Sequence, residues 1–465
     1  MDPHSLTVLR SADRQPRSID ARFSPRVMLL TSGLGQGHSR VAEAIGAGLL
    51  QHGVEAETLD LWSLMHPGVA SIVHQTYLKL VQEHPDLYER LYQLDERTWR
   101  QVLESESGPP AAVLEVLELI ASIASDAESP AVRTLRYSSD RFLMSLLCAA
   151  LPYDGESLGG NGVRARLALM KWTWLRLVKR LETVIRERAP DVLVCTQMIP
   201  AAMVSSLKQR RRLHVPTVGV LTDFGVHDFW IQPGVDRYCV AHASMTTAFD
   251  DDHRSADAMA TGVPLMPGFA QPMLQIEARR QLNLPAKDPV VLVLGGGLGL
   301  SVDSVATQLL RPNDNLNVLV MPGKNAGALR ALTVLRRLHS DRLRVCGWTE
   351  RMDVFMRAAD IVVGKPGGVT VAEVLACGRP LFATRSLGGQ EGFNVRFLEQ
   401  HRVGALLGDH ELFDRVQHMI REPALLQATR ERAWTLGNRN GAASVANLIL
   451  DLSWAARTQA RATEH

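Results

Sequence analysis

The chain has 465 residues, and 46% of them are hydrophobic, which suits two globular domains. Its formal net charge of +2 and its isoelectric point near 8.3 argue against a dedicated nucleic-acid-binding protein. No apolar run reaches the roughly 20 residues that a membrane-spanning helix needs, so any membrane contact is expected to be peripheral.

The start of the chain and its cysteines indicate a compartment. Residues 1–25 are polar and contain several arginines without an apolar stretch, so we expect a disordered arm rather than a signal peptide. The five cysteines are odd in number and scattered, and no two form a C-x-x-C pair. This usage predicts reduced thiols in a cytoplasmic protein.

A glycine-rich loop follows the first predicted strand, Val27 to Thr31. Gly35, Gly37 and His38 lie where this strand meets a predicted helix, and a second strand ending at Asp60 completes a βαβ unit. The helix dipole disfavours a charged imidazole at a helix start. His38 is therefore a candidate general base, because that role needs the neutral ring.

A nicotinamide-binding domain would begin in a similar way, with Asp60 on the cofactor ribose. The glycines here are spaced G-x-G-x-G, whereas the dinucleotide fingerprint is G-x-G-x-x-G. The spacing weakens this alternative without removing it.

The middle of the first half contains a predicted helical insertion at about 104–164, to which we assign no role. A long helix, Val163 to Arg188, then carries tryptophans together with arginines and lysines. Such a helix either docks on an anionic membrane surface or packs against the sheet. We favour packing for most of its length.

Polar residues follow the next predicted strand, Val218 to Thr222. Asp223 and His227 lie on the loop after it, and in open α/β sheets ligands bind at the carboxyl ends of the strands. The proline- and glycine-bearing stretch 261–272 is then the predicted hinge between two domains.

The second half begins in the same way as the first. A strand, Val290 to Leu294, runs into a glycine run that includes Gly296 and Gly297. A later strand ends before Gly367 and Gly368, and a helix follows in which Thr370 is expected to cap the start, either alone or in a capping box with Glu373. Free amides at such a helix start are suited to a diphosphate.

A polar loop follows the next strand, Pro380 to Ala383, and carries Gln390 and Glu391, with Asn394 one helical turn later. Side chains of this kind at a strand end are suited to sugar hydroxyls. The pattern predicts an α/β protein with two Rossmann-like domains, 26–262 and 263–445, facing each other across a cleft. Residues 446–465 are assigned as a C-terminal helix and tail, and this last helix, predicted over Ala443 to Ala456, is expected to return to the first domain.

Three stretches resemble one family. Ser32 to Arg40, Leu221 to Val240 and Gly364 to Asn394 are similar to motifs of the two-domain (GT-B) glycosyltransferases that include monogalactosyldiacylglycerol synthases and processive diacylglycerol glucosyltransferases. The peptidoglycan N-acetylglucosaminyltransferase is a more distant relative. The third stretch is the specific one.

The resemblance implies an inverting, metal-independent transfer of a hexose from a UDP-sugar to a lipid, with diacylglycerol expected, at the inner membrane face. His38 would be the base, and the acceptor would lie near Gly35, Gly37, Asp223 and His227. The donor would lie on the second domain, with Glu373 on the ribose and Gln390 and Glu391 on the sugar. The other implied donor-binding residues are Gly296, Gly297, Gly367, Gly368, Thr370 and Asn394.

One position departs from the family pattern. Met266 occupies the place in the hinge where relatives often carry an arginine near the nucleotide phosphates, so another basic residue would have to substitute. Three alternatives stay open: a same-fold transferase acting on a soluble metabolite, a nicotinamide-dependent oxidoreductase, and a sensor that binds a sugar nucleotide without turnover.

Overall fold

The computed structural model describes residues 24–33, 36–65, 70–71, 74, 160–250, 257–296, 302–311, 315–323, 325–384, 389–408 and 410–463. For residues 160–173, 326 and 459–463 only the backbone is described. Almost all of the predicted arm at 1–25 and of the predicted insertion at 104–164 lies outside these ranges.

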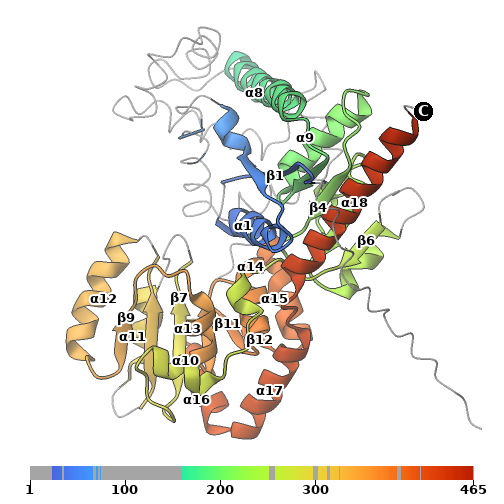
Figure 1. Cartoon of the computed structure of the whole chain (residues 1–465). Helices are drawn as coiled ribbons and strands as arrows, with labels where there is room; N and C mark the ends of the chain where they lie inside the picture. Colours follow the sequence, from blue (N-terminus) through green and yellow to red (C-terminus); the bar gives the residue numbers. More distant parts are fainter. Residues whose placement is uncertain are drawn as a thin grey trace, which may run out of the picture.

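The first half contains a six-stranded parallel sheet with the order β2-β1-β3-β4-β5-β6 (Figure 1). The strands are β1 Val27–Thr31, β2 Ala56–Asp60, β3 Val192–Cys195, β4 Thr217–Val220, β5 Arg237–Val240 and β6 Asp257–Ala260. All pairings are parallel, so every strand ends at the same edge. The helices of this half are α1 Gln36–Leu50, α8 Gly160–Arg188 and α9 Met198–Gln209, with short 3-10 helices η1 Leu61–Leu64, η2 Asp228–Trp230 and η3 Ala243–Phe249.

The second half also contains a six-stranded parallel sheet, with the strand order β12-β11-β10-β7-β8-β9. Its strands are β7 Val290–Leu294, β8 Asn317–Met321, β9 Leu343–Val345, β10 Ile361–Gly364, β11 Leu381–Ala383 and β12 Gly404–Leu406. Its helices are η4 Pro267–Phe269, α10 Gln275–Gln281, α11 Val302–Leu309, α12 Ala326–Leu338, α13 Met352–Ala358, α14 Gly368–Ala376, α15 Gln390–Gln400, α16 Leu412–Arg421 and α17 Pro423–Leu436. The two predicted Rossmann-like units are therefore both present.

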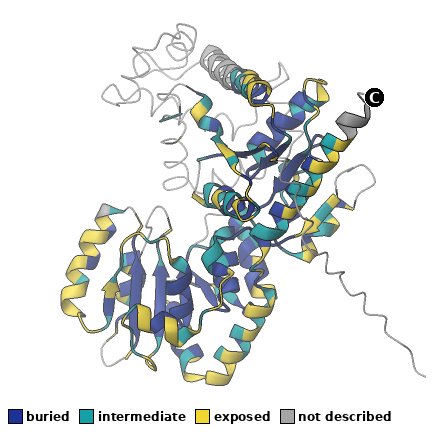
Figure 2. Ribbon diagram, in the orientation of Figure 1, coloured by how far each residue is buried: buried dark blue, intermediate teal, exposed yellow. Residues whose placement is uncertain are grey.

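The central strands form the core of each half (Figure 2). β1, β3, β4, β8 and β10 are buried along their whole length, as expected for parallel strands with helices on both faces. The strands that the sequence did not predict are β5, β6 and β12. The last two are short and partly exposed at the sheet edges, where an apolar run is not required.

The last helix, α18 Gly441–Thr463, crosses back to the first half, as predicted, and packs against α1 (Figure 1). Gly48 of α1 leaves no room for a side chain, because a Cβ there would lie 2.9 Å from the Ala442 carbonyl oxygen. Arg457 of α18 forms an ion pair of 3.0 Å with Asp191. The helix begins two residues before the predicted start at Ala443 and continues beyond the predicted end at Ala456.

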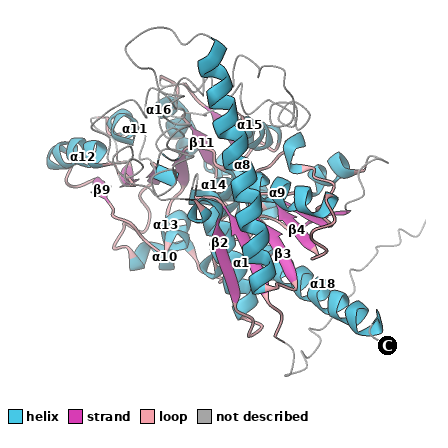
Figure 3. Ribbon diagram, turned by 90° about the horizontal axis from the view of Figure 1, so that it is seen from above, coloured by secondary structure: helices cyan, strands magenta, loops and turns pink. Residues whose placement is uncertain are grey.

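The long helix α8 lies over the first sheet when the molecule is seen from above (Figure 3). Leu177, Val178, Leu181 and Ile185 are buried in the core, so its carboxyl-terminal part packs on the sheet as we favoured. The tryptophan at position 172 lies where only the backbone is described. Within the described ranges, no helix combines the length and the apolar character needed to cross a bilayer.

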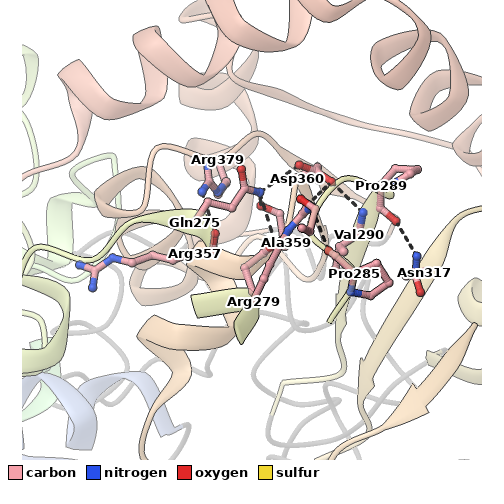
Figure 4. Close-up of polar contacts among 12 residues, drawn as sticks. Gln275, Arg279, Pro285, Pro289, Val290, Asn317, Arg357, Ala359, Asp360 and Arg379 are labelled. Carbon is pink, nitrogen blue, oxygen red and sulfur yellow. Dashed lines mark hydrogen bonds and ion pairs between the residues drawn. The ribbon is translucent and has the colours of Figure 1, made fainter. Parts of the chain in front are cut away.

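A buried carboxylate holds the amino-terminal edge of the second sheet together (Figure 4). Asp360 accepts hydrogen bonds from the Val290 amide at 2.7 Å, from Arg279 at 2.8 Å and from Gln275 at 3.0 Å. Arg430 of α17 also donates to it. Asp360 thus joins α10, β7 and α17 at the edge opposite the strand ends that carry the candidate ligand-binding loops.

Asp360→Asn should lower the free energy of unfolding by about 1.5–3 kcal/mol, the usual contribution of a buried hydrogen bond to a charged group. The amide keeps the shape but has one acceptor oxygen, and it removes the counter-ion of the buried Arg279 and of the partly buried Arg430. Urea unfolding of both proteins measures the difference. An unchanged midpoint would show that these arginines find other partners.

Candidate active site

A cleft with a cavity volume of about 280 Å³ lies between the carboxyl ends of the two sheets. Its walls come from both halves. The first half contributes Gln36, Gly37, His38, Arg40, Thr222 and Asp223, and the second contributes Leu294, Gly295, Gly296, Met321, Gly323, Gly347, Trp348, Thr349, Met352, Met356, Lys365, Gly367, Gly368, Val369, Thr370, Glu373, Gln390 and Glu391.

His38 is the third residue of α1 and faces this cleft. Its Nδ1 lies 2.9 Å from the carbonyl oxygen of Thr196, the residue after β3. A carbonyl oxygen only accepts, so Nδ1 carries the proton and donates it to this bond. The other ring nitrogen, Nε2, is therefore the one with a free lone pair, which is the tautomer that a general base requires.

The surroundings of His38 keep the ring neutral. Burial lowers the pKa of His38 below its ordinary value, while the Asp223 charge and the Thr196 carbonyl oppose this shift. The shift favours the neutral ring, and burial is its largest cause, whereas the sequence-based argument relied on the helix dipole.

Asp223 is connected to His38 through Thr222. The Thr222 hydroxyl donates to the Asp223 carboxylate at 3.3 Å, and its oxygen lies 3.4 Å from Nδ1 of His38. Asp223 also accepts a hydrogen bond of 2.8 Å from the side-chain amide of Asn394 in the second half. The predicted base and the predicted strand-end acid thus belong to one hydrogen-bonded network.

The turn before α14 lines the same cleft as His38. The helix begins at Gly368 and Gly367 caps it, so Thr370 lies within the first turn. The predictions that Thr370 caps the helix, and that it forms a capping box with Glu373, are therefore wrong. The first amides of a helix have no partners within it, which leaves this turn suited to an anion.

Gly368 is also a point of close approach between the two halves. A Cβ at this position would lie 1.9 Å from the Thr222 carbonyl oxygen and 2.7 Å from Asp223 Oδ1. Only a glycine allows the two backbones to approach this far.

Glu373 lies one turn further along α14, in the wall of the cleft. Burial raises its pKa to about 7, the Arg40 charge opposes the rise, and the Asp353 charge adds to it. A carboxyl that titrates near neutral pH inside a cleft is a candidate for contact with a ligand.

Glu373→Gln should stabilise the unliganded protein at pH 8 and much less at pH 5. The folded-state pKa is about 7 and the ordinary value is 4.5, so folding favours the protonated form and stability falls as the pH rises between these values. Thermal unfolding of both proteins at the two pH values measures this. An equal difference at both values would contradict it.

The start of α15 forms the remaining wall. Gly389 precedes the helix with φ +54°, a conformation that favours glycine, and this turn directs Gln390 and Glu391 to the cleft. Glu391 is 3% exposed and its carboxylate pairs with Lys365. Gln390 lines the cleft beside it.

Several lining residues were not predicted from the sequence. Arg40 reaches across the cleft to within 3.4 Å of Glu350, and Trp348, which is 64% exposed, lies at the rim. Gly347 and Trp348 follow β9, so the rule that ligands bind at strand ends would have found them. Arg40 carries no comparable signal, because a charged residue in the second turn of a helix is usually solvated.

Two other predicted residues, His227 and Asn394, do not line the cleft in the described part of the chain. His227 accepts a hydrogen bond from the Phe229 amide at 3.1 Å and caps η2, and Asn394 is fully buried behind the cleft wall. Gly35 and Gly297 lie outside the described residues. Met266 precedes η4 in the hinge and packs on the core.

Asp60, which the nicotinamide alternative would place on the cofactor ribose, is hydrogen-bonded to backbone amides of this chain. Asp60 Oδ1 accepts hydrogen bonds from the amides of Gly33 at 3.2 Å and Trp62 at 3.0 Å. A Cβ on Gly33 would lie 2.5 Å from the other carboxylate oxygen. The carboxylate thus holds the loop after β1 against the start of η1.

The chain is similar in sequence to enzymes named for the glycosylation of diacylglycerol. Residues 164–265 match the family model of monogalactosyldiacylglycerol (MGDG) synthase. The chain is 27% identical over 280 residues to a processive diacylglycerol β-glucosyltransferase of Bacillus pumilus, with 59% of this chain and 72% of that protein covered. With the enzyme of the same name from Bacillus cytotoxicus the identity is 24% over 434 residues, or 92% and 94% of the two chains.

Structure comparison agrees on the fold. MurG of Acinetobacter baumannii superposes with a TM-score of 0.54 at 16% identity, over 92% of this chain and 99% of that one. The glycotransferase of kitacinnamycin gives 0.52 at 13% identity, with the same coverage. The S. aureus MnaA–UDP co-structure gives 0.51 at 10% identity, over 92% and 97%. The two halves thus form the GT-B architecture that the sequence predicted.

Proposed function

We propose a function for this chain on the premise that it is a hexosyltransferase related to the monogalactosyldiacylglycerol synthases and the processive diacylglycerol glucosyltransferases. It transfers a hexose from a UDP-sugar to the hydroxyl of a lipid, with diacylglycerol as the acceptor, and inverts the configuration at the anomeric carbon. One observation carries the proposal: His38 of the first half and the α14 turn of the second half line the same cleft.

The second half supplies the donor site. The free amides before and within the first turn of α14, at Gly367, Gly368 and Thr370, together with Gly296 after β7, would hold the diphosphate. Glu373 would accept hydrogen bonds from the ribose hydroxyls. Gln390 and Glu391 would contact the sugar. The S. aureus protein whose structure contains UDP has the same architecture, which supports a uridine nucleotide as the leaving group.

The cleft also offers a substitute for the hinge arginine that is Met266 here. Arg40 and Lys365 are cationic residues of the cleft wall within the described chain. Arg40 is 24% exposed and its partners Glu43 and Glu350 are mostly solvated, so its charge remains available to a phosphate. We assign the missing phosphate contact to Arg40.

The chemistry follows from these positions. Nε2 of His38 takes the proton of the acceptor hydroxyl while the oxygen attacks the anomeric carbon. The bond to UDP breaks with its electrons on the departing phosphate, where the α14 amides and Arg40 stabilise the growing charge. Because these groups neutralise the leaving group, we propose that no metal takes part. Asp223 stabilises the imidazolium that forms.

The lipid acceptor approaches from the first half, beside Gly37 and Asp223. The related enzymes named for diacylglycerol act on a lipid, and the basic helix α8 is the part of this half that we propose lies near an anionic membrane surface at the inner face of the cell membrane. Leu175 of this helix is 54% exposed.

The test is incubation with UDP-glucose, UDP-galactose and UDP-N-acetylglucosamine in vesicles that contain diacylglycerol and anionic lipid, followed by mass spectrometry of the lipids. A glycosylated diacylglycerol with inverted anomeric configuration by NMR is the expected product. Transfer to small soluble alcohols together with failure to float with vesicles would instead favour a soluble acceptor. Binding of NADH without binding of UDP in calorimetry would favour an oxidoreductase, and binding of UDP-sugars without turnover would favour a sensor.

A further inference from the structure

The helix α15 joins the donor wall of the cleft to the first half. Its first two residues line the cleft, and one turn later the side chain of Asn394 is fully buried between the two halves. The Asn394 amide nitrogen donates to Asp223 Oδ1 at 2.8 Å and to the Pro366 carbonyl at 2.9 Å. Its oxygen accepts the Phe224 amide at 2.7 Å.

These three bonds connect separate parts of the site. Pro366 belongs to the turn that we assign to the diphosphate, whereas Asp223 and Phe224 belong to the loop after β4 in the first half. Asp223 is in turn bonded to Thr222, which contacts His38. A single side chain thus links the proposed donor seat with the group beside the proposed base.

The apolar contacts around Asn394 also join α15 to the loop after β4 in the first half. The Phe224 ring packs on Phe397 of α15 with a centroid distance of 4.5 Å. A Cβ on Gly225 would lie 2.3 Å from the Phe393 ring, so this glycine allows the loop to lie directly against α15. The loop that carries Asp223 therefore rests on α15 over more than one turn.

We propose that Asn394 is a latch for the closed arrangement of the two halves and a positioning residue that holds Asp223 beside His38 only when they meet. The inference rests on the proposed function for its catalytic consequence. It differs from the sequence-based prediction that Asn394 contacts the donor. The bonds to Asp223 and Phe224 cross between the halves, and water can replace them when the halves separate, so the latch is reversible. The bond to Pro366 lies within the second half and keeps the Asn394 side chain in position.

Asn394→Ala and Asn394→Asp test the latch, and Asn438→Ala is the matched control. Asn438 also donates across to the first half, to the Thr261 carbonyl at 2.8 Å, but at the hinge rather than at the cleft. We expect small-angle X-ray scattering to show a larger radius of gyration for both Asn394 variants and no change for the control. Circular dichroism verifies that each variant folds.

The aspartate variant adds a readout that a purely structural role would not affect. It keeps the acceptor for Phe224 but places a second carboxyl against Asp223, so opening should be greater at pH 8 than at pH 5, where protonation restores a donor. For Asn394→Ala we expect kcat to fall by about 10²-fold, with a much smaller change in the Kd for UDP, because misplacement of a positioned group costs this much.

Each outcome decides between the alternatives. Scattering identical to wild type in both variants overturns the latch, as does a weakened UDP Kd with unchanged kcat, which would return Asn394 to the donor site. The scattering experiment needs no turnover. A wild-type protein that transfers no sugar, with variants that still open, would therefore overturn the proposed function and leave the latch in place.

Discussion

Replacing His38 with alanine should lower kcat by about 10²- to 10⁴-fold, the usual contribution of a positioned general base. Its Nδ1 lies against the Thr196 carbonyl, which requires the proton there, so Nε2 is the unprotonated nitrogen of a ring that lines the cleft. UDP release from UDP-sugar in the presence of lipid vesicles measures the loss. The Kd for UDP should change little, because the groups proposed to hold the diphosphate, the α14 turn and Arg40, are left in place.

The pH dependence distinguishes a base from a residue that only maintains the cleft. Because burial lowers the pKa of His38, the acid limb of kcat/KM in the wild type should lie below the ordinary histidine value of 6.5. Asp223 raises this pKa, so Asp223→Asn should move the limb to lower pH. Unchanged turnover in His38→Ala, or a limb that Asp223→Asn moves upward, would remove His38 from the chemistry.

Gly368→Ala is expected to lower kcat by about 10²-fold, because it separates the two halves of the site. The added methyl group would lie 1.9 Å from the Thr222 carbonyl oxygen, a backbone atom of the other half that cannot move aside alone. A displacement of about 1 Å between reacting groups has an effect of this size. Steady-state kinetics and small-angle scattering measure activity and closure together.

Gly367→Ala and Gly46→Ala are the matched controls for this variant. The methyl group on Gly367 would meet nothing nearer than Thr370 Oγ1 at 4.0 Å, so closure should be retained even if phosphate binding changes. Gly46 lies inside α1, where a methyl group would lie 4.0 Å from Leu29, and its activity should match wild type. A fully active Gly368→Ala protein would show that the two halves need not meet this closely for turnover.

The strands and the glycine turns that follow them could be predicted from the sequence alone. Val290–Leu294 and Ile361–Gly364 are apolar runs that end at glycines, and this pattern specifies a buried parallel strand that leads into a ligand-binding turn. His38, Asp223 and Gln390 were found because each is a polar residue on a segment that follows a predicted strand. Glu373 lies in the helix after a glycine turn, and its assignment to the ribose came from the family resemblance. All strands of a parallel sheet end at one edge, which is why these residues line one cleft.

Only the tertiary structure showed which residues of one half contact the other half. Arg40 enters the cleft because α1 faces the second half, and no periodicity within α1 contains that information. Asn394 follows two cleft residues by one turn, yet closure surrounds it with Asp223, Phe224 and Pro366 rather than with the cavity. The sequence by itself determined the two Rossmann-like folds and the glycine turns and polar residues that form part of the cleft wall. The contacts across the cleft depended on how two separately encoded units pack, because residues 170 positions apart carry no local pattern that joins them.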